Sequence, residues 1–239
     1  MKARLRSLWR EWVSPIVFAL LVTQFGAAAV GVDGASMMPA LRHGEHLLLP
    51  TAEGWAHRLG LGEYHRGDIV VFKPPREAAG WRSDHRGLPL PWRYRPYLVK
   101  RVVGVPGDTV SIRAGQVSVN GQPLPEEKTH IYWNAFCADT GSSLANSVAA
   151  SPSRVDVPRV KVPPRSYFVM GDNRSPGGSL DSRTFGPVSV RDISARAVVS
   201  VWPLVREVAA TPPCDGGPKP EQRVTFSGPT KWNPRLLLP

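Results

Sequence analysis

The chain has 239 residues, a formal charge of +11 and only two cysteines. Its lysines and arginines are dispersed, with no basic stripe carrying interleaved aromatic residues, which argues against nucleic-acid binding. The six histidines are scattered and show no metal-ligand spacing, so we expect neither a metal nor a cofactor. Cys137 and Cys214 form one pair without a recognisable pattern, and the sequence leaves open whether they are bridged.

The N-terminal region contains an uncharged run of 21 residues, Trp12–Val32. At about 1.5 Å per residue, a helix of this length crosses a hydrocarbon core of about 30 Å, so we predict one transmembrane helix over residues 12–32. Basic residues precede the run and Asp33 follows it, so the positive-inside rule places residues 1–11 in the cytoplasm and the rest outside the cell membrane. The alternative is a secretory signal peptide cleaved near Ala27-Ala28-Ala29.

Beyond the anchor, short β-branched runs separated by glycine and proline predict a mainly β ectodomain. The expected strands are 47–49, 69–72, 98–105, 167–170 and 197–201, with a hairpin of 110–112 and 116–120 and a short helix over 52–61. We predict that the β domain comprises residues 33–122 and 165–205, with an accessory lobe at 123–164 and a proline-rich, disordered tail at 206–239. The Trp- and Arg-rich segment 78–96 is either a membrane-surface contact or a solvated loop, and the net positive charge favours anionic lipid head groups.

Ser36 is the candidate nucleophile, because it follows the predicted anchor within about one helical turn of the bilayer surface. A serine hydroxyl needs a base, but His43 and His46 lie in a polar segment that is typical of a protein surface. Lys100 instead interrupts an apolar strand, where alternation places it on the same face as Leu98. Burial there favours the neutral amine, which can accept a proton. The alternative is an edge-strand lysine that discourages aggregation.

Four segments of the chain occur in the order of the conserved boxes of bacterial type I signal peptidases, and the sequence resembles that family from the anchor to about Trp202. The segments are Ser36–Leu41, Arg66–Pro74, Lys100–Asp108, and Gly171–Arg174 with Ser179–Gly186. The resemblance implies a signal-peptidase-like β fold and a membrane-bound serine endopeptidase that removes signal peptides. Ser36 would then be the acylating nucleophile and Lys100 its general base.

The resemblance also implies supporting roles for residues behind the nucleophile and base. Ser179 would orient the lysine amine, although two additional residues after Arg174 make Ser175 a competing choice. Charge pairs behind the catalytic groups would involve Asp172, Arg101, Asp181 and Arg183. Each of these is alternatively an ordinary surface ion pair. Gly34 offers no side-chain oxyanion donor, which leaves the Ser36 amide with a water or the Gly34 amide.

The implied substrates are secretory preproteins with small-x-small cleavage sites, bound as an added strand. Candidate pocket residues are Val32, Gly34, Met37, Leu98 and Val99. We expect a monomer that contacts membrane lipids and binds no nucleic acid. Two alternatives remain: a serine–lysine peptidase dedicated to a narrow target, and a membrane-anchored, non-catalytic peptide-binding module.

Overall fold

The computed structural model describes residues 9–76, 78, 82–85, 88–113, 116–125, 157–174, 178–207 and 230–239. Cys137, Cys214 and Ser175 lie outside these residues, as does most of the predicted accessory lobe. The predictions about a cysteine bridge and about Ser175 therefore fall on residues that are not described.

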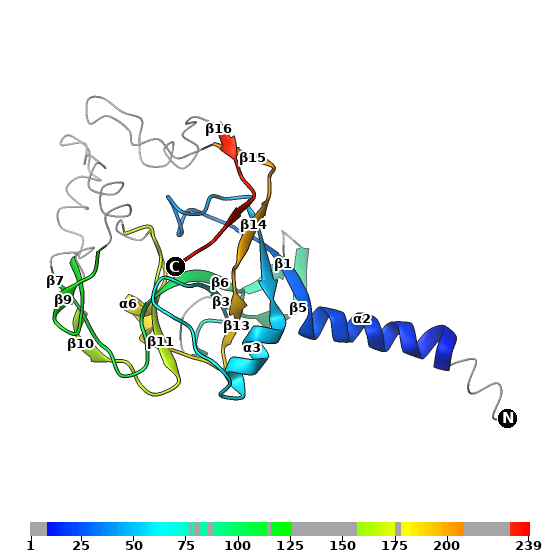
Figure 1. Ribbon diagram of the computed structural model, residues 1–239, viewed down its shortest axis with the longest axis horizontal. Helices are drawn as coiled ribbons and strands as arrows, with labels where there is room; N and C mark the ends of the chain where they lie inside the picture. The colour runs from blue at the N-terminus through cyan, green and yellow to red at the C-terminus, as the bar shows by residue number, and fades with distance from the viewer. Residues whose placement is uncertain are drawn as a thin grey trace.

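The N-terminal arm consists of a short π-helix, η1 (Trp9–Val13), followed by α2 (Ser14–Phe25). This arm projects from the β body (Figure 1). Among the described residues, the helices are all too short or too polar to cross a bilayer. The prediction of one helix over 12–32 is wrong beyond Phe25, because Ala27–Gly31 forms strand β1, antiparallel to β2 (His46–Pro50). An uncharged run has no hydrophobic periodicity that would distinguish a helix from a strand. These small residues pair as a strand instead of extending the helix.

Beyond this arm, strands dominate the part of the chain that the structure describes, as predicted, and they form three larger sheets and two two-stranded sheets. The first sheet has the order β1-β2-β14-β17, with β14 at Val199–Trp202 and β17 at Arg235–Leu236. The second has the order β12 (Val188–Ser189), β11 (Ser166–Met170), β6 (Leu98–Gly104), β3 (Ile69–Phe72) and β13 (Ile193–Arg196). The third has the order β10 (Val157–Lys161), β7 (Thr109–Arg113), β8 (Gln116–Val119) and β9 (Gln122–Pro123).

The remaining described elements are two two-stranded sheets and two short helices. Strand β4 (Arg82–His85) pairs with β5 (Leu88–Tyr94), so part of the segment expected as a loop is a hairpin. Strand β15 (Val205–Glu207) pairs with β16 (Thr230–Trp232). The helices are α3 (Thr51–Arg58) and α6 (Ser182–Phe185).

The structure differs from the predicted limits of the accessory lobe and of the disordered tail. Strand β10 belongs to the predicted accessory lobe but pairs with β7 of the β domain. The predicted disordered tail is wrong for residues 230–239, because β16 pairs with β15 and β17 pairs with β14. Proline content favoured disorder for the whole tail, whereas its last residues pair as strands and Leu237 packs against the core cluster that contains Met37.

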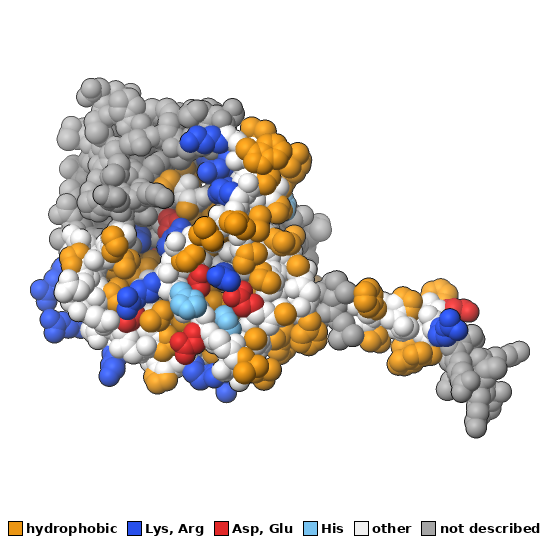
Figure 2. Space-filling model, viewed as in Figure 1, with side chains coloured by type: hydrophobic (Ala, Val, Ile, Leu, Met, Phe, Trp, Pro, Cys, Tyr) orange, Lys and Arg blue, Asp and Glu red, His pale blue; other side chains and the backbone are white. Residues whose placement is uncertain are grey.

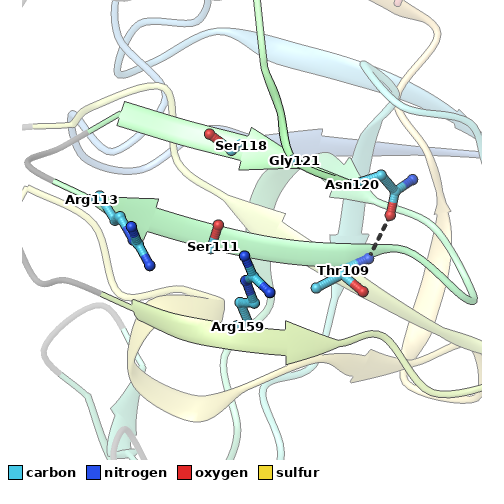
Figure 3. A pocket seen from close by; sticks show the side chains of 7 residues that line it. All are labelled: Thr109, Ser111, Arg113, Ser118, Asn120, Gly121 and Arg159. Carbon is cyan, nitrogen blue, oxygen red and sulfur yellow. Dashed lines mark hydrogen bonds between the residues drawn. The ribbon is translucent and has the colours of Figure 1, made fainter.

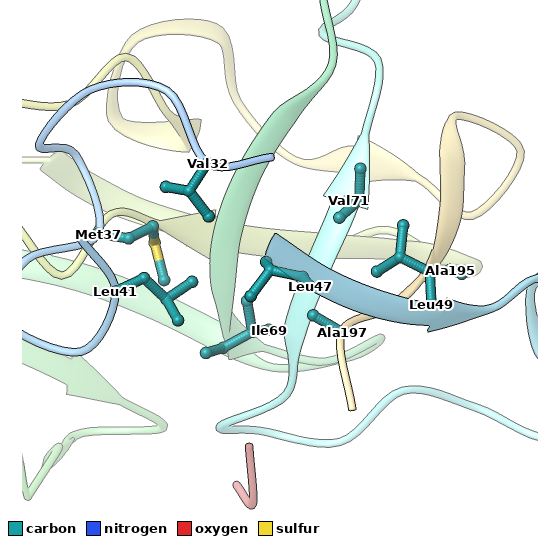
Figure 4. Packing of buried hydrophobic residues seen from close by; sticks show 9 residues of the cluster. All are labelled: Val32, Met37, Leu41, Leu47, Leu49, Ile69, Val71, Ala195 and Ala197. Atoms are coloured by element: carbon teal, nitrogen blue, oxygen red, sulfur yellow. The ribbon is translucent and has the colours of Figure 1, made fainter. Parts of the chain in front are cut away.

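The core beneath the Ser36 segment fixes where that segment lies. Met37 and Leu41, on either side of the turn that follows Ser36, are fully buried with Val32, Leu47 and Val71 (Figure 4). Burying side chains of this size stabilises a fold by about 1.5–3 kcal/mol each. The residues next to the nucleophile are thus held by packing onto the first and second sheets.

Candidate active site

The side chains of Ser36 and Lys100 meet although they are 64 positions apart in the sequence. The distance from Lys100 Nζ to Ser36 Oγ is 2.7 Å, and the amine also donates a hydrogen bond to the Val99 carbonyl oxygen at 2.9 Å. Ser36 lies in the segment between β1 and β2, whereas Lys100 is the third residue of β6. The predicted pair is therefore brought together at hydrogen-bond distance.

Lys100 is an interior residue and not an edge-strand lysine. Strand β6 lies between β11 and β3 in the second sheet, and Lys100 is opposite Val70 of β3. Its side chain is only 2% exposed. Burial disfavours the charged amine and lowers the pKa of Lys100 to about 8. The amine is thus uncharged in a substantial fraction of molecules at mildly alkaline pH.

Two carboxylates near Lys100 oppose this effect, and each is bound by an arginine. Asp181 and Asp172 raise the pKa of the amine, while Arg183 lowers it. Arg183 donates to both oxygens of Asp181, at 2.9 and 2.8 Å. Arg101 likewise grips Asp172, at 2.9 and 2.8 Å. These bidentate pairs compensate the negative charges, so that the carboxylates do not hold the lysine in its protonated form.

The Asp181 carboxylate organises the base of the site. Burial raises the pKa of this carboxyl, but hydrogen bonds from Arg183, the Gly171 amide and the Ser179 hydroxyl outweigh burial and lower it. Ser179 donates to Asp181 Oδ2 at 2.7 Å, and no hydrogen bond joins it to Lys100 among the described residues. The orienting role that the resemblance implies for Ser179 stays a prediction.

The predicted pocket residues occupy different environments. Val32 and Met37 are buried in the core cluster beneath the Ser36 segment, and Val99 packs against the same cluster. Leu98 packs against the cluster on the opposite face of the second sheet. Gly34 is exposed and adopts a positive φ of 88°. Their part in binding a substrate stays a prediction.

The Gly34 amide is not a free oxyanion donor, because it donates to His43 Nδ1 at 3.2 Å. His43 is exposed and also lies 3.2 Å from Asp33, in agreement with the surface position expected for it. The Ser36 amide makes no hydrogen bond to another described residue. Of the two backbone donors considered from the sequence, only that of Ser36 is available in this conformation.

Asn173 and Gly171, which were assigned no role from the sequence, hold the Ser36 segment in place through contacts with its backbone. The Asn173 amide donates to the Ser36 carbonyl oxygen at 3.0 Å, and its side chain donates to the Ala35 carbonyl oxygen at 3.3 Å. Gly171 leaves room for the Ser36 carbonyl and the Ser179 side chain, both of which a Cβ at position 171 would overlap. The signal was present in the sequence: a Gly-Asp-Asn run directly after a predicted strand marks a close backbone approach.

We expect Gly171→Ala to lower kcat by about 10- to 100-fold, because small displacements of reacting groups have effects of this size. Overpacking should also destabilise the fold by about 1–3 kcal/mol. Turnover and thermal unfolding of the purified variant test both effects. Gly31→Ala is the matched control, since a Cβ there meets only His46 at ordinary contact distance. Wild-type turnover in Gly171→Ala would contradict this account of the site.

A separate hollow of about 440 Å³ lies on the third sheet (Figure 3). Its lining residues are Thr109, Ser111, Arg113, Ser118, Asn120, Gly121 and Arg159. Neither Ser36 nor Lys100 contributes to it. The chemically competent groups therefore lie elsewhere, and this hollow is not the candidate active site.

A serine hydroxyl 2.7 Å from a buried amine of lowered pKa is an arrangement compatible with a serine hydrolase. Comparison with known proteins narrows this class. Residues 5–202 match the family described as signal peptidase, peptidase S26. The chain is 32% identical to a signal peptidase I of Leptolyngbya laminosa over 203 residues, covering 83% of this chain and 80% of that protein. It is 34% identical to signal peptidase I V of Bacillus subtilis over 183 residues, covering 76% and 89%.

The chain therefore belongs to the signal peptidase family, peptidase S26, and is a serine peptidase that removes signal peptides from secretory preproteins. A crystal structure of a signal peptidase I from Enterococcus faecalis V583 also matches, with a TM-score of 0.35 and 23% identity over 56% of this chain and 97% of that chain. The family assignment rests on the sequence matches and not on this structural likeness.

Proposed function

We propose that Ser36 attacks the scissile carbonyl of a preprotein and that neutral Lys100 is its general base. The observation that carries this proposal is the 2.7 Å contact between Ser36 Oγ and a buried amine with a lowered pKa. Lys100 takes the hydroxyl proton as Oγ bonds to the carbonyl carbon, and the resulting lysinium protonates the leaving amine. Neutral Lys100 then removes a proton from water, which hydrolyses the ester and releases Ser36.

The tetrahedral intermediate needs a donor for its oxyanion, and the Ser36 amide is the best candidate. That amide has no hydrogen-bond partner among the described residues, whereas the Gly34 amide is bonded to His43. Removing one preorganised oxyanion-hole donor from a serine protease costs about 2.7–4 kcal/mol of transition-state stabilisation. Binding of substrate would then complete the donor set, through a water or through release of Gly34 from His43.

Substrate would bind as an extended strand alongside the segment before Ser36 and the start of β6, with alternate side chains facing the body. Gly34, Val32, Met37, Leu98 and Val99 are the proposed pocket residues. Because Val32 and Met37 are already packed in the core, they would form the floor of shallow pockets. Shallow pockets favour the small-x-small residues that precede a secretory cleavage site.

We further propose that a monomer is held at the cell membrane by its N-terminal arm, with residues 1–11 cytoplasmic and the β domain outside. Along the arm, large apolar side chains are exposed, including Trp12, Ile16 and Phe18. Figure 2 shows such side chains on the arm and at the end of the body where β15 and β16 lie. The exposed apolar residues of β15, β16 and the chain that joins the end of β14 to β15 are Trp202, Leu204, Val205 and Trp232. Surfaces of this kind favour a lipid interface.

The pairing of β1 supports a retained arm over a cleaved one. Ala27–Gly31 pairs along its whole length with β2, from Ala27 opposite Pro50 to Gly31 opposite His46. Cleavage after Ala29 would remove most of this edge strand, leaving only Val30 and Gly31 paired. A retained arm also keeps enzyme and substrate on one surface, which raises their effective concentration.

The purified full-length chain in proteoliposomes should cleave several unrelated preproteins after small-x-small sequences. Cleavage products are identified by mass spectrometry, and membrane attachment is measured by retention in the pellet after an alkaline carbonate wash. Cleavage of one preprotein alone would favour a dedicated processing peptidase. No cleavage of any preprotein would leave only a binding module, and full release by carbonate would contradict the anchored arm.

A further inference from the structure

The C-terminal segment, residues 230–239, lies outside the family match to residues 5–202 but is built into the catalytic body. Strand β17 pairs with β14 through Ser200 opposite Arg235 and Val199 opposite Leu236. The Leu237 amide donates to the Val198 carbonyl oxygen at 2.8 Å, and the Leu237 side chain packs against the core cluster that contains Met37. Pro239 lies so close to Gly67 that a Cβ atom at position 67 would overlap Pro239.

Arg235 joins this segment directly to the chain that follows the nucleophile. One guanidinium nitrogen, Nη2, donates to the Ala40 carbonyl oxygen at 2.7 Å and to Glu45 Oε2 at 2.9 Å. The other, Nη1, donates to the side-chain and main-chain oxygens of Asn233, a residue with no exposed surface. A planar guanidinium with fixed donors fixes the relative positions of its acceptors in a way that a single ammonium does not.

Glu45 makes the attachment point rigid. It is 1% exposed, and its carboxylate accepts from Ser200 Oγ at 2.8 Å in addition to Arg235. Arg206 lies at 3.8 Å from the other oxygen. Burying a carboxylate without such partners carries a large desolvation penalty. The native fold therefore keeps Glu45 in the position where these partners reach it. The main chain at Glu45 also accepts from the Val32 amide at 2.7 Å, which closes the base of the segment that carries Ser36.

The Ser36 segment is thus restrained from two sides. On one side, Asn173 binds the Ser36 and Ala35 carbonyl oxygens. On the other side, Arg235 binds the Ala40 carbonyl oxygen, four residues after the nucleophile. Asn173 follows β11 of the second sheet, whereas Arg235 belongs to β17 of the first, so the two restraints connect the nucleophile to both sheets.

We propose that Arg235 is a positioning residue for catalysis, and that the C-terminal segment is an intramolecular clasp that holds Ser36 opposite Lys100. The proposal rests on the proposed function in one respect, that Ser36 is the nucleophile. Arg235 itself touches no reacting atom. Its effect is exerted through the Ala40 carbonyl and Glu45, which set where the Ser36 hydroxyl lies.

The test compares Arg235→Ala with Arg206→Ala in the full-length enzyme. Both variants remove an arginine from Glu45, but only Arg235 contacts the main chain after Ser36. We expect Arg235→Ala to lower the single-turnover cleavage rate by about 10- to 100-fold, with KM changed less than about 3-fold. Arg206→Ala should stay within about 3-fold of the wild-type rate. All rates are measured well below the unfolding temperature of each variant.

If the alanine variant does not fold, Arg235→Lys still tests the proposal. Lysine preserves the charge opposite Glu45 but replaces the planar fork by a single ammonium. We expect the unfolding temperature of this variant to lie within a few degrees of that of the wild type, and its cleavage rate to be lowered by about 3- to 10-fold. The midpoint of its pH profile should be unchanged, because Lys100 keeps its surroundings. A merely structural arginine would instead give a lysine variant with full wild-type rate.

A wild-type rate in Arg235→Ala or in Arg235→Lys overturns the proposal, and so does an equal loss in Arg206→Ala and Arg235→Ala. Ser36→Ala in the same assay separates this failure from failure of the proposed function. If Ser36→Ala is inactive while the Arg235 variants are fully active, only the clasp is rejected. If Ser36→Ala still cleaves, the nucleophile assignment fails first.

Discussion

Ser36→Ala should lower kcat/KM for preprotein cleavage by about 10³-fold or more, because no other hydroxyl is bonded to the buried amine among the described residues. The fold should remain, since Ser36 is half-buried and its carbonyl bonds to Asn173 whatever its side chain. Product formation over long incubations and thermal unfolding of the purified variant measure the two effects.

Ser179→Ala is the matched control for this experiment. Its hydroxyl lies in the same site but donates to Asp181 and not to Lys100. We expect a smaller loss than for Ser36→Ala, because the nucleophile and the base both remain. Robust cleavage by Ser36→Ala, or an equal loss in both variants, would contradict the assignment of Ser36.

Lys100→Met should also abolish cleavage, with a comparable loss of about 10³-fold, while the protein becomes no less stable at neutral pH. The stability effect follows from the pKa values. The amine titrates near 10.5 when unfolded and near 8 when folded, so the unfolded state binds more protons between these values. Wild-type stability therefore rises with pH from about 8 to 10.5, and below pH 8 the buried cation costs about 3 kcal/mol. Methionine removes this cost.

Lys100→Arg is the complementary variant, because a guanidinium stays protonated at every accessible pH and has no lone pair to accept the Ser36 proton. It should be inactive throughout the pH range and less stable than Lys100→Met. Thermal unfolding of the three proteins between pH 6 and 10 should show the advantage of Lys100→Met shrinking as the pH rises. Activity in Lys100→Arg would exclude Lys100 as the base.

Three strands of the second sheet, β3, β6 and β11, could be predicted because their runs of β-branched and aromatic residues are typical of buried strands. Ile69–Phe72 is a continuous β-branched and aromatic run, and all four residues are buried in β3. The prediction of a continuous helix was wrong beyond Phe25, because the residues there have no pattern that is specific to one type of structure. An uncharged stretch is compatible with a helix or a strand, and only the pairing of Ala27–Gly31 with β2 decides between them. Such pairing depends on residues 15 to 23 positions away in the sequence and leaves no local signal.

The C-terminal strands show the same limit from the other direction. Composition indicated disorder for residues 206–239, because proline content is an average over the segment. Asn233 and Arg235 are nevertheless bonded to Ser200 and Ala40, which belong to other parts of the chain. A sequence contains no local record of these long-range partners.

The candidate site was more predictable than its supports. Lys100 could be found because a lysine within Leu98–Val103 is anomalous in an apolar strand, and the resemblance paired it with Ser36. The arginine partners of Asp172 and Asp181 were also named, and their bidentate contacts are present. Gly171 and Asn173 were not assigned roles, because they act on backbone atoms of the Ser36 segment, Gly171 by lacking a side chain and Asn173 through its main-chain and side-chain amides.

The central claim is that an uncharged, buried amine removes the proton of Ser36. The most direct test is kcat/KM as a function of pH, measured with a peptide substrate that has no titratable group near its cleavage site, because this profile reports the free enzyme. The account predicts a rate that rises with pH through a single midpoint near 8, where Lys100 loses its proton. A midpoint near 6.5, typical of histidine, or a profile that does not rise between pH 6 and 9 would contradict it.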